Sequence, residues 1–224
     1  MRVTVHTQIQ RSLVRPVLID SGQFRQTYQV NRHVQQMANF EVDGQAFDDD
    51  PQVDTLMALF DKTFYQSFNT RLIRGDDEPV YLPASATVPY HQIVFAHGFF
   101  SSALHEIAHW CIAGARRRLL EDYGYWYCPD GRDASQQAEF EQVEVRPQAI
   151  EWALTVAAGR RFQVSTDNLN GAEPDREGFT RAVRAQLNDY LVSGFPLRAQ
   201  MFIDALRQTF NTSAQALITQ AQAA

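Results

Sequence analysis

Cysteine is nearly absent from this sequence, which has only Cys111 and Cys128 among its 224 residues. A disulfide-stapled framework is therefore excluded, and we expect both thiols to stay reduced in the cytoplasm. No apolar run approaches the roughly 20 residues that a membrane-spanning helix needs. The N-terminus also lacks the charged, apolar and small-residue regions of a secretory signal in their usual order. The sequence thus predicts a cytoplasmic protein with no membrane partner.

Positive charge is also in short supply. The chain has 20 basic and 26 acidic side chains, for a formal net charge of -6. Non-specific nucleic-acid binding needs clustered lysine and arginine, so we expect no direct nucleic-acid contact. Apolar residues make up 45% of the chain, which is enough for a full globular core. The length suits one domain with an appendage.

The N-terminal part differs in composition from the rest of the chain. Residues 1–50 are rich in glutamine, arginine, valine and asparagine and show no sustained hydrophobic period. We expect an extension that is loosely ordered, or that precedes a true start at a later residue such as Met37. The folded domain is predicted to cover residues 51–212. The tail at residues 213–224 is rich in alanine and glutamine and is predicted to be a frayed helix.

Hydrophobic spacing predicts an α+β fold, with one small sheet packed against several helices. The predicted helices cover residues 53–69, 102–113 with an extension to 120, 135–158, 176–193 and 197–210. The predicted strands cover residues 71–74, 80–82 and 91–96. We expect Ser101 or Ser102 to cap the second helix. Pro147 is expected to end or kink the third helix near Arg146.

Residues 105–109 read His-Glu-Ile-Ala-His, which is the H-E-x-x-H pattern on a predicted central helix. Residues four apart on a helix lie about 40° apart around its axis, so His105 and His109 project from one side. Their nitrogens can then reach one metal ion at roughly 2.0–2.1 Å. Glu106 lies about 100° around from His105, where it can reach a bound water as a catalytic residue. The alternative is a pair of ordinary histidines without a metal.

Two histidines hold a metal weakly, so we expect a third protein ligand. The predicted helix at 135–158 offers Glu139, Glu141, Glu144 and Glu151. Glu144 falls at the edge of the apolar stripe of this helix, and a carboxylate pressed toward the core is costly unless a cation or metal pairs with it. Glu144 is therefore the predicted third ligand and Glu141 the reserve. The alternative for Glu144 is an ordinary half-exposed helix carboxylate.

Two histidines and one glutamate fit two kinds of chemistry. With zinc, the site activates water, and Glu106 acts as general base in peptide hydrolysis. With Fe(II), the same set is a 2-His-1-carboxylate facial triad whose open positions accept dioxygen. The motif alone favours the zinc metallopeptidase.

Five stretches of the sequence resemble the elongation factor P hydroxylase family. They are Asn69–Pro79, Val94–Gly98, Leu104–Gly114, Gly124–Asp133 and Val143–Trp152. The resemblance implies hydroxylation of the β-lysylated lysine of translation elongation factor P, after a separate ligase has attached the β-lysine. It also implies a non-haem metal, for which we expect Fe(II), with dioxygen as cosubstrate. The implied fold is similar to that of a small metal-dependent ribonuclease family.

The resemblance can be carried to individual residues. His105 and His109 match the histidines of the family's motif, and Glu144 matches the carboxylate of its Val-Glu-Val segment. Two further alternatives stay open beside the hydroxylase and the peptidase. The fold similarity prompts a nuclease-like hydrolase, and a translation-associated binding module with a structural metal would need no catalysis.

The modified lysine arm is long, flexible and cationic. A site for it should offer carboxylates and aromatic faces near the metal. Asp130, Trp126 and Tyr125 are the candidate substrate-binding residues, all within a loop rich in aromatic side chains. Ordinary surface chemistry explains each of them about as well.

Overall fold

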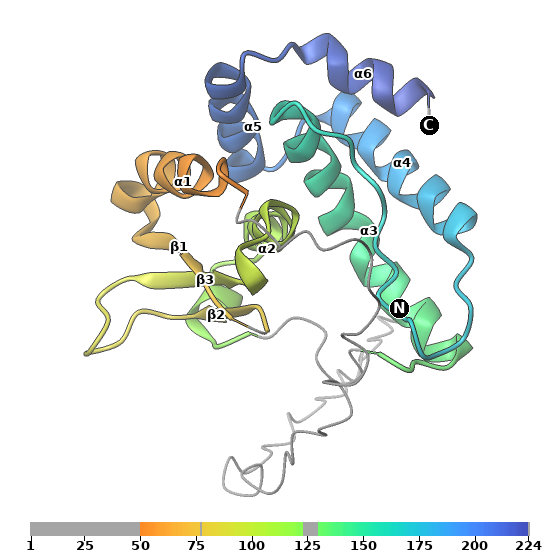
Figure 1. Ribbon diagram of the computed structural model, residues 1–224, viewed down its shortest axis with the longest axis horizontal. Helices are drawn as coiled ribbons and strands as arrows, with labels where there is room; N and C mark the ends of the chain where they lie inside the picture. The colour runs from red at the N-terminus through yellow and green to blue at the C-terminus, as the bar shows by residue number, and fades with distance from the viewer. Residues whose placement is uncertain (1–49, 77, 123–129, 224) are drawn as a thin grey trace, which may run out of the picture. The chain divides into compact units, whose positions relative to one another are not determined.

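The computed structural model describes residues 50–76, 78–122 and 130–223 (Figure 1). These residues form a mixed α+β arrangement, which confirms the predicted class. The helices are α1 (Val53–Phe68), α2 (Phe100–Ile112), α3 (Ala134–Ala157), α4 (Arg176–Ser193), α5 (Leu197–Phe210) and α6 (Ala214–Ala223), with short 3-10 turns η2 (Ala96–Gly98) and η3 (Arg117–Leu119). The predictions for residues 1–49, Cys128, Tyr125 and Trp126 lie outside the described residues.

The sheet has three strands, β1 (Thr70–Arg74), β2 (Val80–Leu82) and β3 (His91–Phe95), in the order β1-β3-β2. Strands β1 and β3 run parallel, whereas β2 is antiparallel to β3. Leu72 of β1 pairs with Ile93 of β3, and both side chains are buried against the helices. One small sheet at the predicted positions is therefore confirmed. The similarity to a ribonuclease fold stays a prediction.

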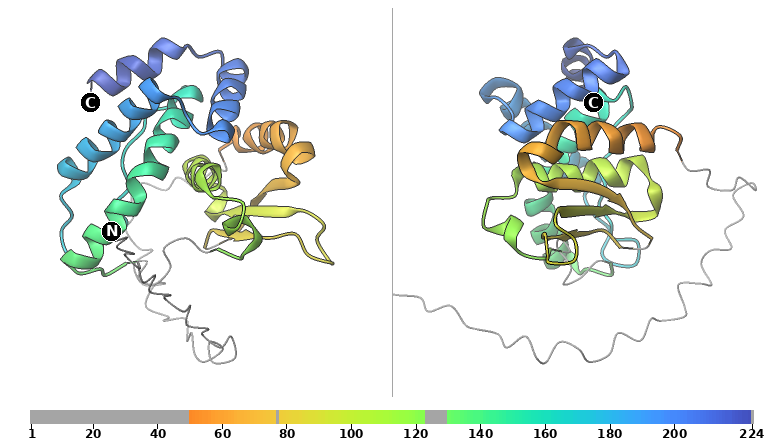
Figure 2. Two further views of the ribbon diagram at one scale, coloured as in Figure 1. Left: turned by 180° about the vertical axis from the view of Figure 1, so that it is seen from behind. Right: turned by 90° about the vertical axis from the view of Figure 1, so that its left-hand side faces the viewer.

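Helix α2 lies between the sheet on one side and α3 on the other (Figures 1 and 2). Because α2 packs against the sheet and against α3, most of its 13 residues are buried, and the buried residues lie on more than one face of the helix. The expected cap at Ser101 or Ser102 is wrong, because the helix begins at Phe100 without a side-chain cap. The Ser102 hydroxyl instead accepts a hydrogen bond from the Ala96 N–H at 3.0 Å.

The C-terminal end of α2 is closed by arginine side chains from elsewhere. The backbone of Ala113 is extended, with a ψ angle of 122°, so the helix ends before this residue. The predicted extension of this helix to residue 120 is therefore wrong. Arg198 of α5 donates to the carbonyls of Trp110, Cys111 and Ala113 at 2.8, 3.0 and 2.7 Å. Guanidinium groups at this position satisfy carbonyls that have no helical partner and complement the helix dipole.

Helix α3 runs without interruption for 24 residues, although Pro147 lies inside it. Pro147 therefore does not end this helix near Arg146, and the expected kink stays a prediction. Proline removes one backbone donor, but residues 147–158 are all buried in the core, so tertiary contacts hold the helix together. The Gln148 side chain also exchanges two hydrogen bonds with the Ser165 backbone, at 2.8 and 3.0 Å.

The remaining helices enclose the core around α2 and α3. Helix α4 lies along α3, and α5 contacts α1, α2 and α3. The predicted tail is helix α6, and its Leu217 and Ala221 side chains are buried, so it is docked on the core. No helix in the described ranges is both long and apolar enough to cross a membrane.

An aromatic cluster fixes α2 against α1 and α5. Trp110 of α2 contacts Phe60, Phe64 and Phe68 of α1, with ring centroids 5.4, 4.9 and 5.5 Å apart. Phe202 of α5 contacts Phe64 at 5.6 Å. The contacts of Trp110 with α1 are edge-to-face, and such contacts stabilise a core beyond the burial of apolar area alone.

We expect Phe64→Ala to lower the free energy of unfolding by about 3–5 kcal/mol, because it opens a cavity at a fully buried position. Urea denaturation followed by circular dichroism measures this loss. The control is Val192→Ala, whose side chain is 91% exposed, and which should change stability by less than about 0.5 kcal/mol. Equal stability of the two variants would contradict a tightly packed cluster.

Candidate metal centre

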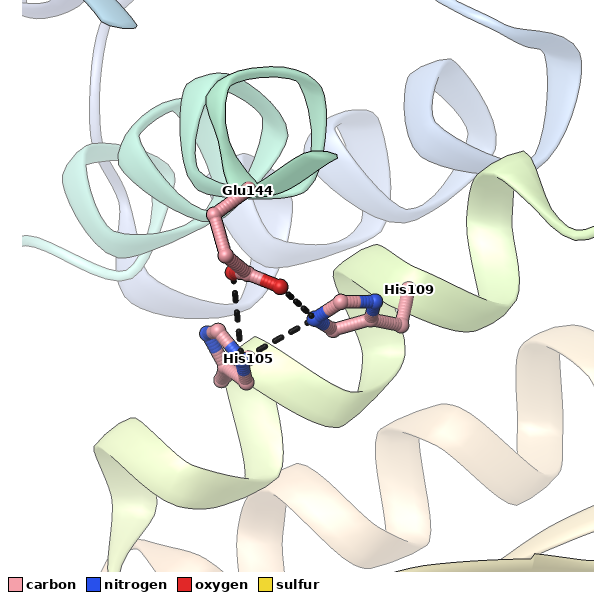
Figure 3. Close-up of side chains that lie close together, drawn as sticks. All are labelled: His105, His109 and Glu144. Atoms are coloured by element: carbon pink, nitrogen blue, oxygen red, sulfur yellow. Dashed lines mark hydrogen bonds and ion pairs between the residues drawn. The ribbon is translucent and has the colours of Figure 1, made fainter. Parts of the chain in front are cut away.

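Two histidines from α2 and one glutamate from α3 converge at the contact between these helices (Figure 3). The Nε2 atoms of His105 and His109 lie 3.0 Å apart. Glu144 Oε1 lies 3.2 Å from His109 Nε2, and Glu144 Oε2 lies 3.7 Å from His105 Nε2. One ligand atom from each residue thus falls within 4.8 Å of the others.

This donor set fits a divalent metal ion. Donors that each lie about 2.1 Å from one ion are themselves about 3 Å apart, which matches the observed separations. The Glu144 side chain is only 3% exposed, and an unpaired carboxylate at such a position is costly. Within the described parts of the chain, these three side chains form the group of histidine, cysteine and acidic residues that could hold an ion.

The two candidates for the third ligand point to different places. Glu144 faces the histidines. Gln148, one turn later, donates a hydrogen bond from its Nε2 to Glu144 Oε2 at 3.4 Å. Glu141 is outside the cluster, and its Oε1 accepts a hydrogen bond from the Gln137 amide at 2.9 Å. The geometry therefore favours Glu144 over Glu141.

The charges of the cluster depend strongly on one another. Burial opposes the charged form of Glu144, but His109 and then His105 lower the pKa of this carboxyl group from 4.5 to about 2. Burial likewise opposes the charged form of His105, but the carboxylates of Glu151 and Glu144 raise its pKa well above 6.5. Burial raises the pKa of Glu106, which lies beside the cluster on α2. The negative charge of Glu144 is therefore stable only while a cation lies next to it.

Glu151 is a site residue to which the sequence reasoning gave no role. Its Oε2 lies 2.8 Å from His105 Nδ1, while His105 Nε2 faces the cluster. This is the contact through which a carboxylate commonly fixes the ring orientation of a metal-binding histidine. Glu151 follows Glu144 by seven residues, or two helical turns, so the heptad spacing was the signal that could have identified it.

Asp130 is the predicted substrate-binding residue that lies in the described part of the chain, and it is not part of the cluster. Asp130 is exposed, and its carboxylate accepts hydrogen bonds from the backbone N–H groups of Asn170 and Gly131 at 3.0 and 2.7 Å. These bonds, the Asn170 backbone bond first, lower the pKa of Asp130. In the described residues, Asp130 thus ties its own segment to the backbone of Asn170. Its part in substrate binding stays a prediction. Cys111 is buried and free, and burial raises the pKa of its thiol to about 12.

A cavity of about 250 Å³ lies directly beside the candidate metal centre. His109 and Glu106 form one part of its wall, where α2 passes between the sheet and α3. Its apolar lining comes from Ile93, Trp110, Ile112, Val143 and Pro147. A molecule in this cavity would therefore meet an apolar surface and reach the metal-binding side chains at one end.

We expect the stability of the metal-free protein to fall between pH 4.5 and pH 2, because Glu144 becomes protonated there. Its pKa is lower in the folded protein than in the unfolded chain, so its contribution is complete above pH 4.5 and lost toward pH 2. The difference between these two pKa values of Glu144 corresponds to about 3 kcal/mol in the free energy of unfolding. Urea unfolding over this range should show a smaller pH dependence for Glu144→Gln than for the exposed-site control Glu139→Gln. Identical pH profiles for both variants would refute the assignment.

The comparison with known proteins covers the sheet, α2 and α3. Residues 59–221 match the family model described as elongation factor P hydroxylase. A relative from Haemophilus influenzae, named elongation factor P lysine hydroxylase, is 52% identical over 161 residues, which are 72% of this chain and 90% of the relative. The residues matched by the family model contain His105, His109 and Glu144. The chain belongs to the elongation factor P hydroxylase family.

Proposed function

We propose that this protein hydroxylates the β-lysylated lysine of translation elongation factor P. The family description and the name of the Haemophilus influenzae relative support the reaction and the protein substrate. The observation that supports the chemistry is the convergence of His105, His109 and Glu144 within 4.8 Å. These three residues would hold a metal ion, for which Fe(II) is the proposed identity, with dioxygen as cosubstrate.

The donor set suits oxygen chemistry. Two imidazoles and one carboxylate leave coordination positions open, and Fe(II) bound in this way activates dioxygen for attack on a C–H bond. Hydroxylation replaces one C–H hydrogen by a hydroxyl group that contains one oxygen atom of dioxygen. The second oxygen atom leaves as water, so each turnover consumes two electrons and two protons from an external reductant.

The side chains around the ligands have separate tasks in this proposal. Glu151 holds the His105 ring through Nδ1, so that Nε2 is directed toward the metal position. Glu144 supplies the anionic ligand from the other helix. Glu106, predicted from the sequence to be catalytic, lines the cavity beside His109 and so faces the space where substrate can enter.

The zinc metallopeptidase remains the alternative, because the same three ligands also suit zinc and Glu106 could then serve as general base. The family match favours the hydroxylase. The two functions differ in metal and in product. Protein that retains zinc after anaerobic purification and cleaves casein would support the peptidase and contradict the hydroxylase.

We expect the protein, supplied with Fe(II), ascorbate and oxygen, to add the mass of one oxygen atom to β-lysylated elongation factor P. Intact-protein mass spectrometry of the factor measures this change. His105→Ala, His109→Ala and Glu144→Ala should each abolish the reaction, because each removes one of three ligands. Glu141→Ala is the matched control and should retain activity. Full activity in Glu144→Ala together with loss in Glu141→Ala would show that the third ligand is misassigned.

The role of Glu151 can be tested on metal binding alone. We expect Glu151→Ala to weaken metal affinity by about 10- to 100-fold, because the His105 ring loses its hydrogen-bond acceptor. Glu151→Gln, whose amide oxygen still accepts that bond, should fall between wild type and Glu151→Ala. Anaerobic competition with a chromogenic chelator measures the affinities, with exposed Glu139→Ala as control. Wild-type affinity in Glu151→Ala would contradict an orienting role.

A further inference from the structure

The cavity beside the candidate metal centre is small. Its volume of about 250 Å³ is below the roughly 300–1,000 Å³ typical of pockets for drug-sized ligands. Its walls combine the aliphatic side chains of Ile93, Ile112 and Val143 with the ring of Pro147. Such walls suit methylene groups, which gain about 0.8 kcal/mol each on burial. The expected occupant is therefore an alkyl chain and not a folded peptide segment.

The charged side chains that line this cavity differ in their hydrogen-bond and ion-pair partners. Arg117 and Asp122 form an ion pair with each other. Arg118 donates a hydrogen bond to the carbonyl of Ala113 at the end of α2. Glu106 also lines the cavity, but within the described ranges no hydrogen bond or ion pair joins its carboxylate to another protein group. A half-buried carboxylate without a partner is best stabilised by a cationic ligand group.

The chemistry of the modified lysine places a cation in this position. If a carbon of the lysine stem is held at the metal, the β-lysyl group at the end of that stem must extend beyond it. The β-lysyl group is joined through an amide carbonyl, and its alkyl chain carries two ammonium groups, one on the third carbon and one at the end. The lining of the cavity includes the candidate ligand His109, the carboxylate of Glu106 and several apolar side chains, so it offers apolar walls and an anion within one space next to the candidate metal centre.

We propose that the cavity binds the β-lysyl arm and that the Glu106 carboxylate pairs with one of its ammonium groups. This inference rests on the proposed function and deepens it, because it makes Glu106 the residue that distinguishes the β-lysylated factor from the unmodified one. Glu106 is then a specificity residue that touches substrate, and it is neither a metal ligand nor a general base.

Binding to the metal-loaded protein under anaerobic conditions tests this role without turnover. Isothermal titration with β-lysylated and with unmodified elongation factor P gives the preference of each variant for the modified factor. We expect Glu106→Gln to reduce that preference by roughly 10- to 100-fold, the usual effect of losing a charge-assisted hydrogen bond. Its affinity for the unmodified factor and for the metal should equal those of wild type.

The matched control is Glu121→Gln, which removes an exposed carboxylate next to Asp122 that does not line the cavity. It should keep the full preference and so separate direct contact from a change in net charge. A Glu106→Gln protein that still prefers the modified factor as strongly as wild type overturns the inference. Loss of metal affinity in Glu106→Gln also overturns it, because the residue would then serve the metal site.

A second variant tests the cavity itself from the opposite wall. Val143→Phe on α3 fills part of the space and should weaken binding of the β-lysylated factor at least as much as Glu106→Gln, without loss of metal. Unchanged binding by Val143→Phe would show that the arm lies elsewhere. A wild-type protein that adds no oxygen to the factor would instead contradict the proposed function, and this outcome is separate from the binding preferences.

Discussion

The structure depends on the contact between α2 and α3, at which one buried carboxylate meets two imidazoles. Glu144 is almost inaccessible to water, so its charge must be balanced locally. The adjacent side chains of His109 and His105 stabilise the carboxylate, and a metal ion would stabilise it further. The helix crossing therefore does more than bury apolar area, because it also determines which charge states of these three residues are compatible with the fold.

The surroundings of this contact show how a small domain supports such a cluster. Helix α2 is enclosed by the sheet, α3 and the aromatic rings of α1 and α5, so its two histidines have little freedom to move apart. Glu151 holds the far side of the His105 ring. On the side of Glu106 the enclosure is incomplete, and this is where the cavity lies.

Much of this arrangement follows from hydrophobic spacing in the sequence. The period of apolar residues placed the helices and strands within a few residues, and the apolar stripe of α3 favoured Glu144 over Glu141. The continuation of α3 past Pro147 is not predictable from the missing N–H of proline, because burial of the following residues keeps the helix intact. The start of α2 was misjudged because Ser102 bonds to Ala96, a contact that no periodicity reveals. The contact of Glu151 with His105 is not among the predictions, because the seven-residue spacing places Glu151 on the face of Glu144 but does not show that this face lies against α2.

The arginine contacts at the end of α2 have a consequence for biosynthesis. The carbonyls of Trp110, Cys111 and Ala113 receive their donors from Arg198, which is synthesised more than 80 residues later. Glu144 and Glu151 are likewise translated after the two histidines. Domains generally fold as units while the chain emerges from the ribosome. Helix α2 can therefore take its final place only after α5 has been released, and loading of a metal at the proposed centre would follow translation of almost the whole chain.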